Sequence, residues 1–495
     1  MNTLKFILED QAKTLFPNRT TQLLIQHGEP LIKAYIAKCF DENEPSFSFL
    51  PQQRVYAAKH GLNLRRTVKL DAVAEYYIYD IVNRHRKRFR KPHEKKRSHF
   101  GYRFTKQAYL NPSVSYKAFK TAISKYTKTY QYFISFDVAS YFNNLYHHDL
   151  AGWLLKLGAE QKDYEHFGQY LREINAGRSV DVLPQGIYPA KMIGNDFLRF
   201  VDNHHGLRSQ QLLRFMDDFY LFSDDADAIR SDFLLIQKLI GEKSLSLNPN
   251  KTSRVTASHT QIAADIDSVK KKLLDRRRQE ITVGGYDDEE DETVNITVKM
   301  PLSKEELDYI IALLAQETLE EEDAELVLSV MRDHATKAER KLDYIIHTFP
   351  NLMKSVFNFC SRVIDKEFIA ELLLKALKSN ELQEYQLFWF GHILESYLMH
   401  TNKASSLINA IYNHPNSTII SKAKILEIGD KRFGLPEIRE PLLTSGQSDW
   451  LSWSAAVGER NQQPATRNYR LSYFAKASSM NSLVSSVISQ MTAED

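Results

Sequence analysis

Three aspartates stand where their carboxylates could act together on metal ions. Asp217 and Asp218 are adjacent within QLLRFMDDFYLF, and Asp137 ends the apolar segment YQYFISFD. An Asp–Asp pair is costly in isolation because like charges repel and raise one pKa, so a folded protein tends to keep it at the surface or with a metal. Clustered carboxylates can hold two ions about 3.5–4 Å apart for an in-line displacement at phosphorus. The sequence therefore predicts a two-metal site, with Mg²⁺ as the metal and Mn²⁺ as the alternative.

Short apolar strands must carry these aspartates. YQYFISFD reads as one strand, and QLLRFMDDFYLF reads as two strands that meet at Asp217 and Asp218. A helix is predicted next, with Asp224 or Asp225 as its N-cap, because apolar residues recur at helical spacing at Ile229, Phe233, Ile236 and Ile240. A third strand, SLSL, is expected after it. These elements predict an α+β core with carboxylates at strand ends along one edge.

The rest of the chain divides by pattern into further regions. Residues 1–130 read as helices with basic loops, and the α+β core is expected over 131–275. Residues 276–300 read as a hairpin or linker that holds the acidic run DDEEDE. From 301 to 495 helix follows helix, opening with a capping box at Ser303 and Glu306, which favours a solenoid-like array. The tail from about Thr444 is expected to be partly irregular, with a last helix in SMNSLVSSVISQM.

Composition excludes several classes of protein. With 495 residues, 43% of them apolar, the chain can bury more than one core. Its apolar stretches are broken by charge well before the roughly 20 residues that a membrane span needs, and the N-terminus lacks a signal-peptide core. Cys39 and Cys360 lie far apart without CxxC or His-rich company, so neither a disulfide framework nor a zinc site is expected. We expect a soluble, cytoplasmic protein without a membrane partner.

Charge is bunched by sign although the net charge is only +3. The segment RHRKRFRKPHEKKRSHFGYR, from Arg84 to Arg103, holds one acid, Glu94. Two interpretations remain open for it, a phosphate-binding surface and a solvated helix face. The interleaved aromatic residues favour nucleic acid.

Four motifs in order resemble the palm of reverse transcriptases, specifically the bacterial retron, group II intron and abortive-infection types. FDVASYF (136–142) resembles their motif A, LPQGIYPAKMIGN (183–195) motif B, FMDD (215–218) motif C and LSLNPNKT (245–252) motif D. The resemblance covers residues 60–255, and it implies an α+β palm over 131–275 with fingers before it. A helical half after such a core is similar to the abortive-infection (Abi) and defence-associated (DRT) reverse transcriptases of bacteria.

The resemblance also implies roles for single residues. Asp137 and Asp217 would bridge the metals, Asp218 would complete the site and the Val138 carbonyl could add a ligand. Lys251 would neutralise or protonate pyrophosphate. Phe142 would be the steric gate that favours deoxynucleotides. Residues lining the incoming nucleotide would be Gln185, Gly186 and Asn195, and triphosphate-binding bases in the fingers would be Arg65, Arg66, Lys69 and Arg103.

The resemblance implies an RNA-directed or untemplated DNA polymerase in antiphage defence. Its partners would be dNTPs, an RNA template or non-coding RNA, a DNA product and further copies of the chain. Motif B has Ala190 where the family usually has Ser, and no aromatic-Leu-Gly primer grip follows motif D. Primer handling therefore stays open. Two alternatives are a retron or group II intron-type enzyme and a catalytically idle scaffold that kept the polymerase fold.

Overall fold

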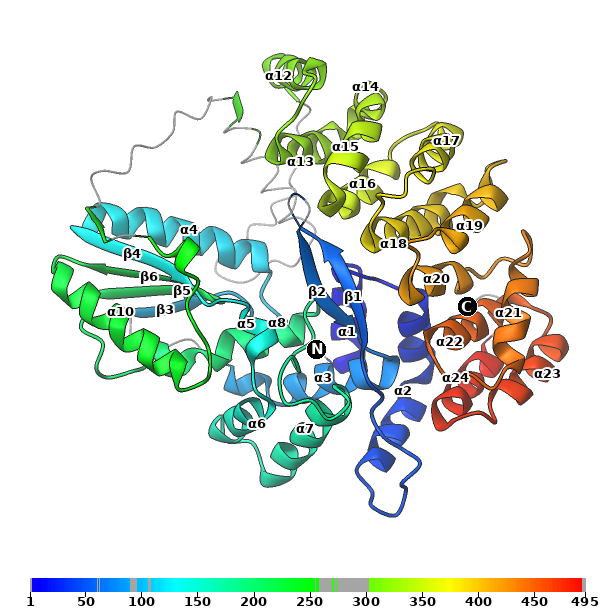
Figure 1. Ribbon diagram of the computed structural model, residues 1–495, viewed down its shortest axis with the longest axis horizontal. Helices are drawn as coiled ribbons and strands as arrows, with labels where there is room; N and C mark the ends of the chain where they lie inside the picture. The colour runs from blue at the N-terminus through cyan, green and yellow to red at the C-terminus, as the bar shows by residue number, and fades with distance from the viewer. Residues whose placement is uncertain are drawn as a thin grey trace, which may run out of the picture.

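The structure is a computed structural model, and it describes residues 2–59, 61, 63–89, 96–105, 108–253, 255–257, 269–270, 273 and 302–491 (Figure 1). The hairpin or linker predicted at 276–300 lies outside these residues. The described chain forms a mixed α/β part followed by a long series of helices, which is the predicted fold class.

A five-stranded sheet carries the three aspartates. Its order is β3-β5-β6-β4-β7, and the strands are β3 (Arg97–Phe100), β4 (Tyr132–Asp137), β5 (Gln211–Phe215), β6 (Asp218–Ser223) and β7 (Thr256–Ala257). Strand β6 is antiparallel to both β4 and β5, while β3 runs parallel to β5. The strands predicted on either side of the aspartates are thus confirmed. Their register places Asp137 directly opposite Asp218.

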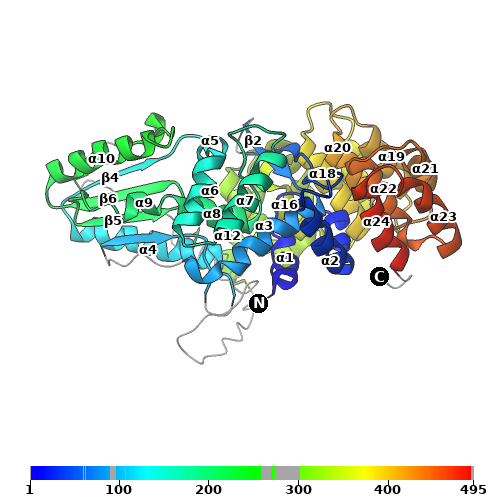
Figure 2. The same ribbon diagram turned by 90° about the horizontal axis from the view of Figure 1, so that it is seen from below.

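Helices α4 (Pro112–Thr129) and α10 (Ala226–Gly241) cover opposite faces of this sheet (Figures 1 and 2). Helix α10 is the predicted helix, and its N-cap is Asp225, whose side chain accepts a hydrogen bond from the Asp227 N–H. Phe233 of α10 meets Phe136, which stacks on Phe219 with centroids 5.1 Å apart. On the other face a smaller aromatic and aliphatic cluster holds α4, made by Phe119, Phe133, Leu213 and Phe222.

The prediction of a strand at SLSL is wrong. Only Leu247 forms a bridge, with Val138, because the backbone enters the left-handed region at Ser244 (φ 56°). The Ala139 N–H donates to the Ser246 carbonyl at 2.7 Å, and the Asn248 N–H donates to the Asp137 carbonyl at 2.9 Å. The segment therefore crosses the end of β4 and continues as the 3₁₀ turn η2 (Pro249–Lys251) beside Asp137.

The N-terminal part contains a hairpin that the sequence analysis did not predict. Its strands are β1 (Gln53–Ala58) and β2 (Leu64–Lys69), paired antiparallel. Around it and the sheet lie α1 (Thr3–Gln11), α2 (Arg19–Cys39), α3 (Ala72–Arg84), η1 (Arg86–Arg88), α5 (Tyr141–Asn144), α6 (His147–Lys156), α7 (Gln161–Glu173), α8 (Tyr188–Phe197) and α9 (Arg199–Asp202).

The second half forms an arc of helices, as predicted (Figure 1). The capping box at Ser303 and Glu306 is confirmed. The helices are α12 (Lys304–Ala315), α13 (Glu321–Val330), α14 (Ala335–Ala338), α15 (Leu342–Thr348), α16 (Met353–Cys360), α17 (Lys366–Ala376), α18 (Glu384–Ile393), α19 (Ala404–Asn413), α20 (Ile419–Leu426), α21 (Leu435–Thr444), α22 (Trp450–Gly458), α23 (Pro464–Phe474) and α24 (Ser479–Gln490). Between them lie the short turns η4 (Met331–His334), η5 (Glu339–Lys341), η6 (Pro350–Leu352), η7 (Leu394–Leu398) and η8 (Glu459–Asn461).

The packing in this arc is solenoid-like. Along much of it each helix packs on the helix two places further on, as α16 does on α18, α18 on α20 and α20 on α22. The expectation of a partly irregular tail is wrong, because Trp450, Leu471, Val484 and Ile488 supply buried apolar faces to α22, α23 and α24. No helix among the described residues is long and apolar enough to cross a membrane.

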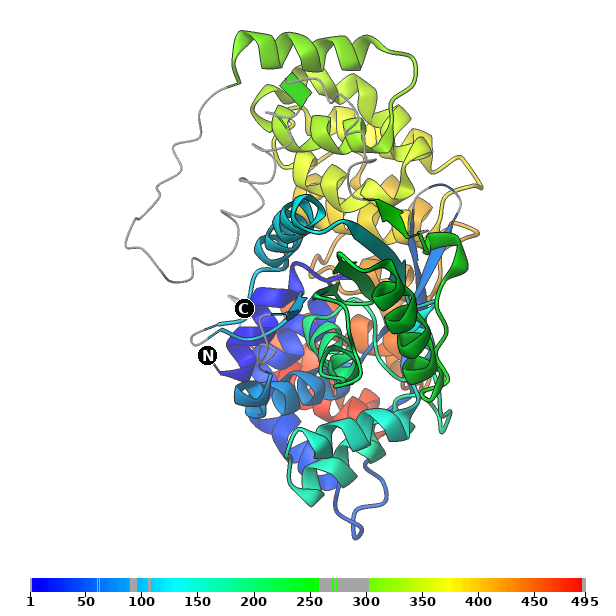
Figure 3. The same ribbon diagram turned by 90° about the vertical axis from the view of Figure 1, so that its left-hand side faces the viewer.

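The end of the arc packs on the N-terminal helix α2. Glu427 is fully buried there, and it accepts hydrogen bonds from the Thr20 N–H at 2.7 Å and the Thr20 hydroxyl at 2.9 Å. Lys424, also fully buried, donates to Glu427 at 2.7 Å and to Glu395 at 2.5 Å. Figure 3 shows the two halves from the side, with the arc extending past the sheet.

Candidate active site

The three aspartates lie together at one end of the sheet. Asp137 is the last residue of β4 and is 5% exposed, and its register partner Asp218 begins β6. Asp217 lies in the turn between β5 and β6, where Met216 has φ 57°, a conformation that costs a non-glycine residue free energy. The Val138 N–H donates to the Asp217 carbonyl at 3.3 Å, which joins this turn to the end of β4.

Lys251 reaches the site from the turn η2, near the end of the LSLNPNKT segment. Its ammonium lies 2.8 Å from Asp137 Oδ2, although the lysine side chain is 66% exposed. This hydrogen bond raises the pKa of Lys251, so the cation is kept. The other carboxylate oxygen, Asp137 Oδ1, is buried and has no hydrogen-bond partner in the part of the chain that the structure describes. Asp137 therefore holds one cation and has one oxygen left to bind another.

The remaining two carboxylates repel each other. Burial, with the charges of Asp218 and Asp137, raises the pKa of Asp217 to about 6. Burial also raises the pKa of Asp218, against the opposing charges of Lys251 and Lys120. A nearby divalent cation would stabilise the ionised form of both carboxyl groups and so lower both pKa values.

The donor set fits a divalent metal, although the side chains are not gathered around one point. Among the described residues, no three His, Cys, Asp or Glu side chains are placed to hold an ion as they stand. One reason is that the Asp137 carboxylate is paired with the Lys251 ammonium. Hard cations such as Mg²⁺ prefer oxygen ligands, and Asp137 Oδ1 has no hydrogen-bond partner among the described residues.

A buried ion pair supports the turn that presents Asp217, and the sequence analysis did not identify it. Arg214 and Asp202 are both fully buried, and their bidentate contact includes a 2.7 Å bond from the Arg214 Nε. Arg214 also donates to the Met216 carbonyl at 2.8 Å. A charged residue inside the apolar strand QLLRF was the signal that could have pointed to it.

Asn195 also holds the turn that presents Asp217. It is 1% exposed, and its Oδ1 accepts from the Met216 N–H at 3.2 Å and from Arg214 at 3.3 Å. The prediction that Asn195 lines the incoming nucleotide therefore disagrees with its position, because the side chain is enclosed beneath the turn. Its amide fixes Met216 in the left-handed conformation.

Phe142 lies against α8, beside Gly194. A methyl group built on Gly194 of α8 would lie 3.0 Å from Phe142 Cζ, closer than nine in ten real contacts of this kind. The neighbouring Tyr141 hydroxyl donates to the Gly194 carbonyl at 2.8 Å. The absence of a side chain at Gly194 therefore sets how closely the Phe142 ring approaches the helix.

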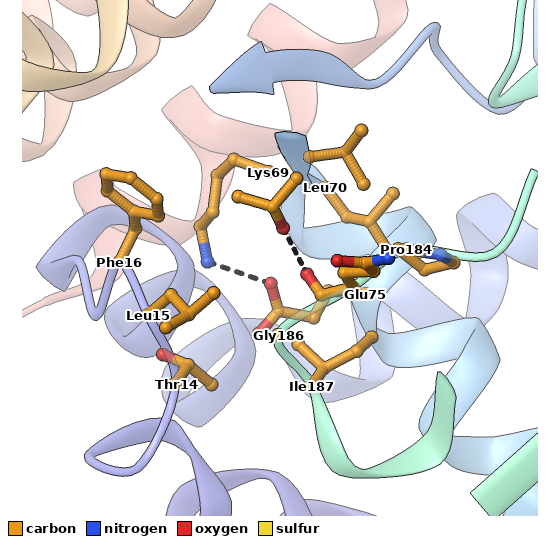
Figure 4. A pocket seen from close by; sticks show the side chains of 12 residues that line it. Thr14, Leu15, Phe16, Lys69, Leu70, Glu75, Pro184, Gly186 and Ile187 are labelled. Atoms are coloured by element: carbon orange, nitrogen blue, oxygen red, sulfur yellow. Dashed lines mark hydrogen bonds and ion pairs between the residues drawn. The ribbon is translucent and has the colours of Figure 1, made fainter. Parts of the chain in front are cut away.

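Gln185 and Gly186 line a small cavity between β2 and the loop after α1 (Figure 4). Gly186 has φ 110°, and its backbone approaches Leu15 so closely that an added Cβ would lie 3.3 Å away. The Thr67 hydroxyl donates to the Gln185 carbonyl, which fixes the loop to β2. The three aspartates do not line this cavity.

Lys69 points into the same cavity and is not free to bind a triphosphate. It is 5% exposed, and its ammonium pairs with buried Glu75 at 2.9 Å (Figure 4). The prediction of a phosphate-binding role therefore disagrees with its surroundings, because a second anion would have to compete with Glu75.

The other predicted bases differ in how accessible they are. Arg65 is exposed on β2, whereas Arg66 pairs with Asp181. Arg103 is half-buried, and burial lowers its pKa. Of these four bases, Arg66 and Lys69 are thus already paired with carboxylates.

The basic segment from Arg84 to Arg103 is used largely inside the protein. Arg84 pairs with Asp163 at 2.8 Å, Arg88 donates to the Leu157 carbonyl at 2.8 Å, and buried Arg97 donates to the Ser209 carbonyl at 3.0 Å. Residues 90–95 lie outside the described chain. In the described part, structural contacts account for these three arginines better than a phosphate-binding surface does.

Comparison with known proteins identifies the domain that contains the three aspartates. Residues 80–302 match the family model of the reverse transcriptase (RNA-dependent DNA polymerase). That part of the chain is therefore a reverse transcriptase domain, and it supports RNA-directed DNA polymerase activity, a nucleotidyltransferase activity. Polymerases of this family use divalent metal ions.

Solved structures with some similarity include two yeast telomerases. Telomerase from Candida albicans, in complex with a fragment of telomeric RNA, is 13% identical, with 83% of this chain and 69% of that chain covered and a TM-score of 0.32. Apo telomerase from Candida tropicalis is also 13% identical, with 78% and 73% covered and a TM-score of 0.30. A comparison with curated proteins finds no match.

Proposed function

We propose that the chain synthesises DNA from dNTPs at Asp137, Asp217 and Asp218. The observation that carries this proposal is the register of β4 and β6, which sets Asp137 opposite Asp218 with Asp217 one residue before it. Mg²⁺, with Mn²⁺ as the alternative, would be held by these carboxylates and the Val138 carbonyl, and would supply charge stabilisation at the reacting phosphate and activation of the attacking hydroxyl.

The protein's own residues would position the nucleotide and move a proton. Lys251 contacts Asp137, and its exposed ammonium can turn from that carboxylate to donate a proton to the leaving pyrophosphate. Arg65 is the exposed base on β2 that remains available for the triphosphate. Gln185 and Gly186 would border the base and sugar, with the glycine allowing close approach of the backbone.

Replacing Phe142 with Ala is expected to weaken selection against ribonucleotides. In the proposed role its ring would stand where a ribose 2′-hydroxyl would project, and a steric contact of this kind supplies roughly 1–3 kcal/mol, or about 10–200-fold. We therefore expect the ratio of kcat/KM for dNTP over rNTP to fall by at least about 10-fold. Single-nucleotide incorporation with matched dNTP and rNTP measures this ratio.

Gly194→Ala tests the same ring without removing it. The added methyl group would push Phe142, so we expect a changed ratio with the aromatic residue still present. Gly152→Ala is the control, because a methyl group there meets nothing within 4 Å. If both Phe142→Ala and Gly194→Ala leave the ratio at the wild-type value, Phe142 is not the gate.

We further propose a biological role in bacterial antiphage defence, with an RNA template or non-coding RNA as partner, a DNA product and a homo-oligomeric state. The support is the resemblance of the four motifs and the helical half to Abi and DRT enzymes. In cells that carry the gene, we expect Asp217→Asn/Asp218→Asn to restore phage plaque numbers to the level of cells without it. Protection that persists in the double variant would instead assign the effect to the helical array as a scaffold.

A further inference from the structure

The outward side of helix α4 carries several lysines and no acid. Four lysines on this helix are exposed, and they are Lys117, Lys120, Lys125 and Lys128. At about 100° per residue all four fall within one half of the helix, opposite Phe119, which is 1% exposed against the sheet. We call these four residues the α4 lysine face.

The charges of the α4 lysine face are not balanced by acids. No Asp or Glu occurs between Glu94 and Asp137 in the sequence. None of the four lysines forms an ion pair with another described residue, whereas Lys33 on α2 pairs with Glu29 at 2.8 Å. Like charges three or four residues apart cost a helix stability. An uncompensated cationic face of this kind attracts polyanions.

Aromatic rings accompany two of these lysines. The Lys120 ammonium lies 5.3 Å from the centroid of Tyr116, and the Lys125 ammonium lies 5.4 Å from that of Tyr126. Tyr116 is 44% exposed. Basic side chains interleaved with accessible aromatic rings are the two components that bind a single-stranded nucleic acid without reading its sequence.

The α4 lysine face lies on the same side of the sheet as the catalytic carboxylates. Alternate residues of β6 point to one face, and Tyr220 and Phe222 on that face meet Phe119 and Tyr126 of α4. Asp218 belongs to the same alternate set. The N-terminal half of α4 is at the catalytic end, since the Tyr116 and Phe215 rings are 5.2 Å apart and the charge of Lys120 acts on Asp218.

We infer that the α4 lysine face binds the sugar–phosphate backbone of the DNA strand whose 3′ end the aspartates extend. This inference rests on the proposed function. From Lys117 to Lys128 the helix rises about 17 Å, or roughly five nucleotide steps of 3.4 Å along a DNA strand. The surface would hold the growing strand near the active site in a chain that lacks a recognisable primer grip after motif D.

Binding of a fluorescein-labelled 20-nucleotide single-stranded DNA tests the inference. The variant changes all four lysines to Gln, and the control changes four exposed lysines of the helical arc to Gln, namely Lys337, Lys378, Lys431 and Lys476. Each phosphate neutralised on a single strand contributes about 0.7 to the slope of log K against log salt. We expect the magnitude of this slope to be smaller by nearly 3 in the α4 variant, and its affinity to be at least about 10-fold weaker. The control should keep the wild-type slope and affinity.

The design separates this surface from the catalytic proposal. Asp217→Asn/Asp218→Asn should bind the DNA with the wild-type slope, since its α4 lysine face is intact. A folded α4 variant with wild-type affinity and slope would overturn the inference even if the wild type polymerises. If the α4 variant loses the slope while the wild type makes no polymer, the α4 lysine face binds DNA, but the proposed function fails and so does the assignment of that DNA as the extended strand. Thermal melting of each variant checks folding.

Discussion

Asp217→Asn is expected to stabilise the metal-free protein and to slow nucleotide incorporation about 1,000-fold. Burial and the charges of Asp218 and Asp137 raise the pKa of Asp217 to about 6 from an ordinary value of 3.8. At about 1.36 kcal/mol per pKa unit, ionising this carboxyl in the folded state costs on the order of 2–3 kcal/mol. Asn removes that cost together with a metal ligand, and losing roughly 4 kcal/mol of transition-state stabilisation slows the reaction about 1,000-fold.

The pH dependence of this added stability follows from the raised pKa of Asp217. A carboxyl whose folded pKa is raised opposes folding fully above the folded pKa and not at all below the unfolded pKa. The difference in free energy of unfolding between Asp217→Asn and the wild type is therefore greatest above about pH 6, and it disappears between pH 6 and 4. Urea unfolding of both proteins in EDTA at pH 7.5 and pH 4.5 measures this difference.

A matched control and a metal titration complete the experiment. Asp227→Asn changes a carboxylate whose side chain is 87% exposed, and we expect less than about 0.5 kcal/mol of change. Added Mg²⁺ should raise the melting temperature of the wild type and leave that of Asp217→Asn nearly unchanged. An Asp217→Asn protein less stable than the wild type in EDTA at pH 7.5 would contradict the repulsion described here.

Arg214→Met is expected to cost about 3–5 kcal/mol of folding stability, the usual effect of breaking a buried ion pair from one side. Arg214 and Asp202 are both 0% exposed, so the substitution leaves a buried carboxylate without its main cation. His99 cannot replace it, because burial lowers the His99 pKa to about 3. Chemical denaturation measures the loss of stability.

The double variant Arg214→Met/Asp202→Leu separates stability from positioning. Replacing both members of a buried pair by apolar residues can restore stability. The Met216 carbonyl would still lack its donor Arg214, so the turn that presents Asp217 would stay loose. We therefore expect recovered stability with nucleotide incorporation still reduced. Recovery of both would show that Arg214 has no positioning role.

The elements that carry the aspartates could be predicted because their signals are local. YQYFISFD and QLLRFMDDFYLF are apolar runs bounded by polar residues, and the α10 N-cap and helical period are both explicit in the sequence. SLSL has strand composition too. It fails to become a strand because its backbone crosses the end of β4 beside Asp137 and turns toward Lys251.

The supporting contacts could not be predicted because each joins side chains of different elements, and the packing of those elements is not a local signal. Lys69 and Glu75 meet across a buried corner, and Asn195, Arg214 and Asp202 converge from α8, β5 and α9. Motif resemblance marks Asn195 and Lys69 as important residues, but it does not indicate whether a side chain faces solvent or the protein interior. The β1–β2 hairpin was missed for a related reason, since Thr67 on β2 is held by the Gln185 carbonyl, 118 residues away.

The most direct test of the central claim is incorporation of labelled dNTPs by the purified full-length protein in Mg²⁺. Wild type, Asp217→Asn/Asp218→Asn and the exposed-site control Asp227→Asn would be compared, each with and without EDTA, on a primed RNA template and with no added template. The account predicts labelled polymer from the wild type and Asp227→Asn in Mg²⁺ alone, and none from the double variant. Polymer made by the double variant at the wild-type rate, or wild-type synthesis that EDTA leaves unchanged, would contradict it.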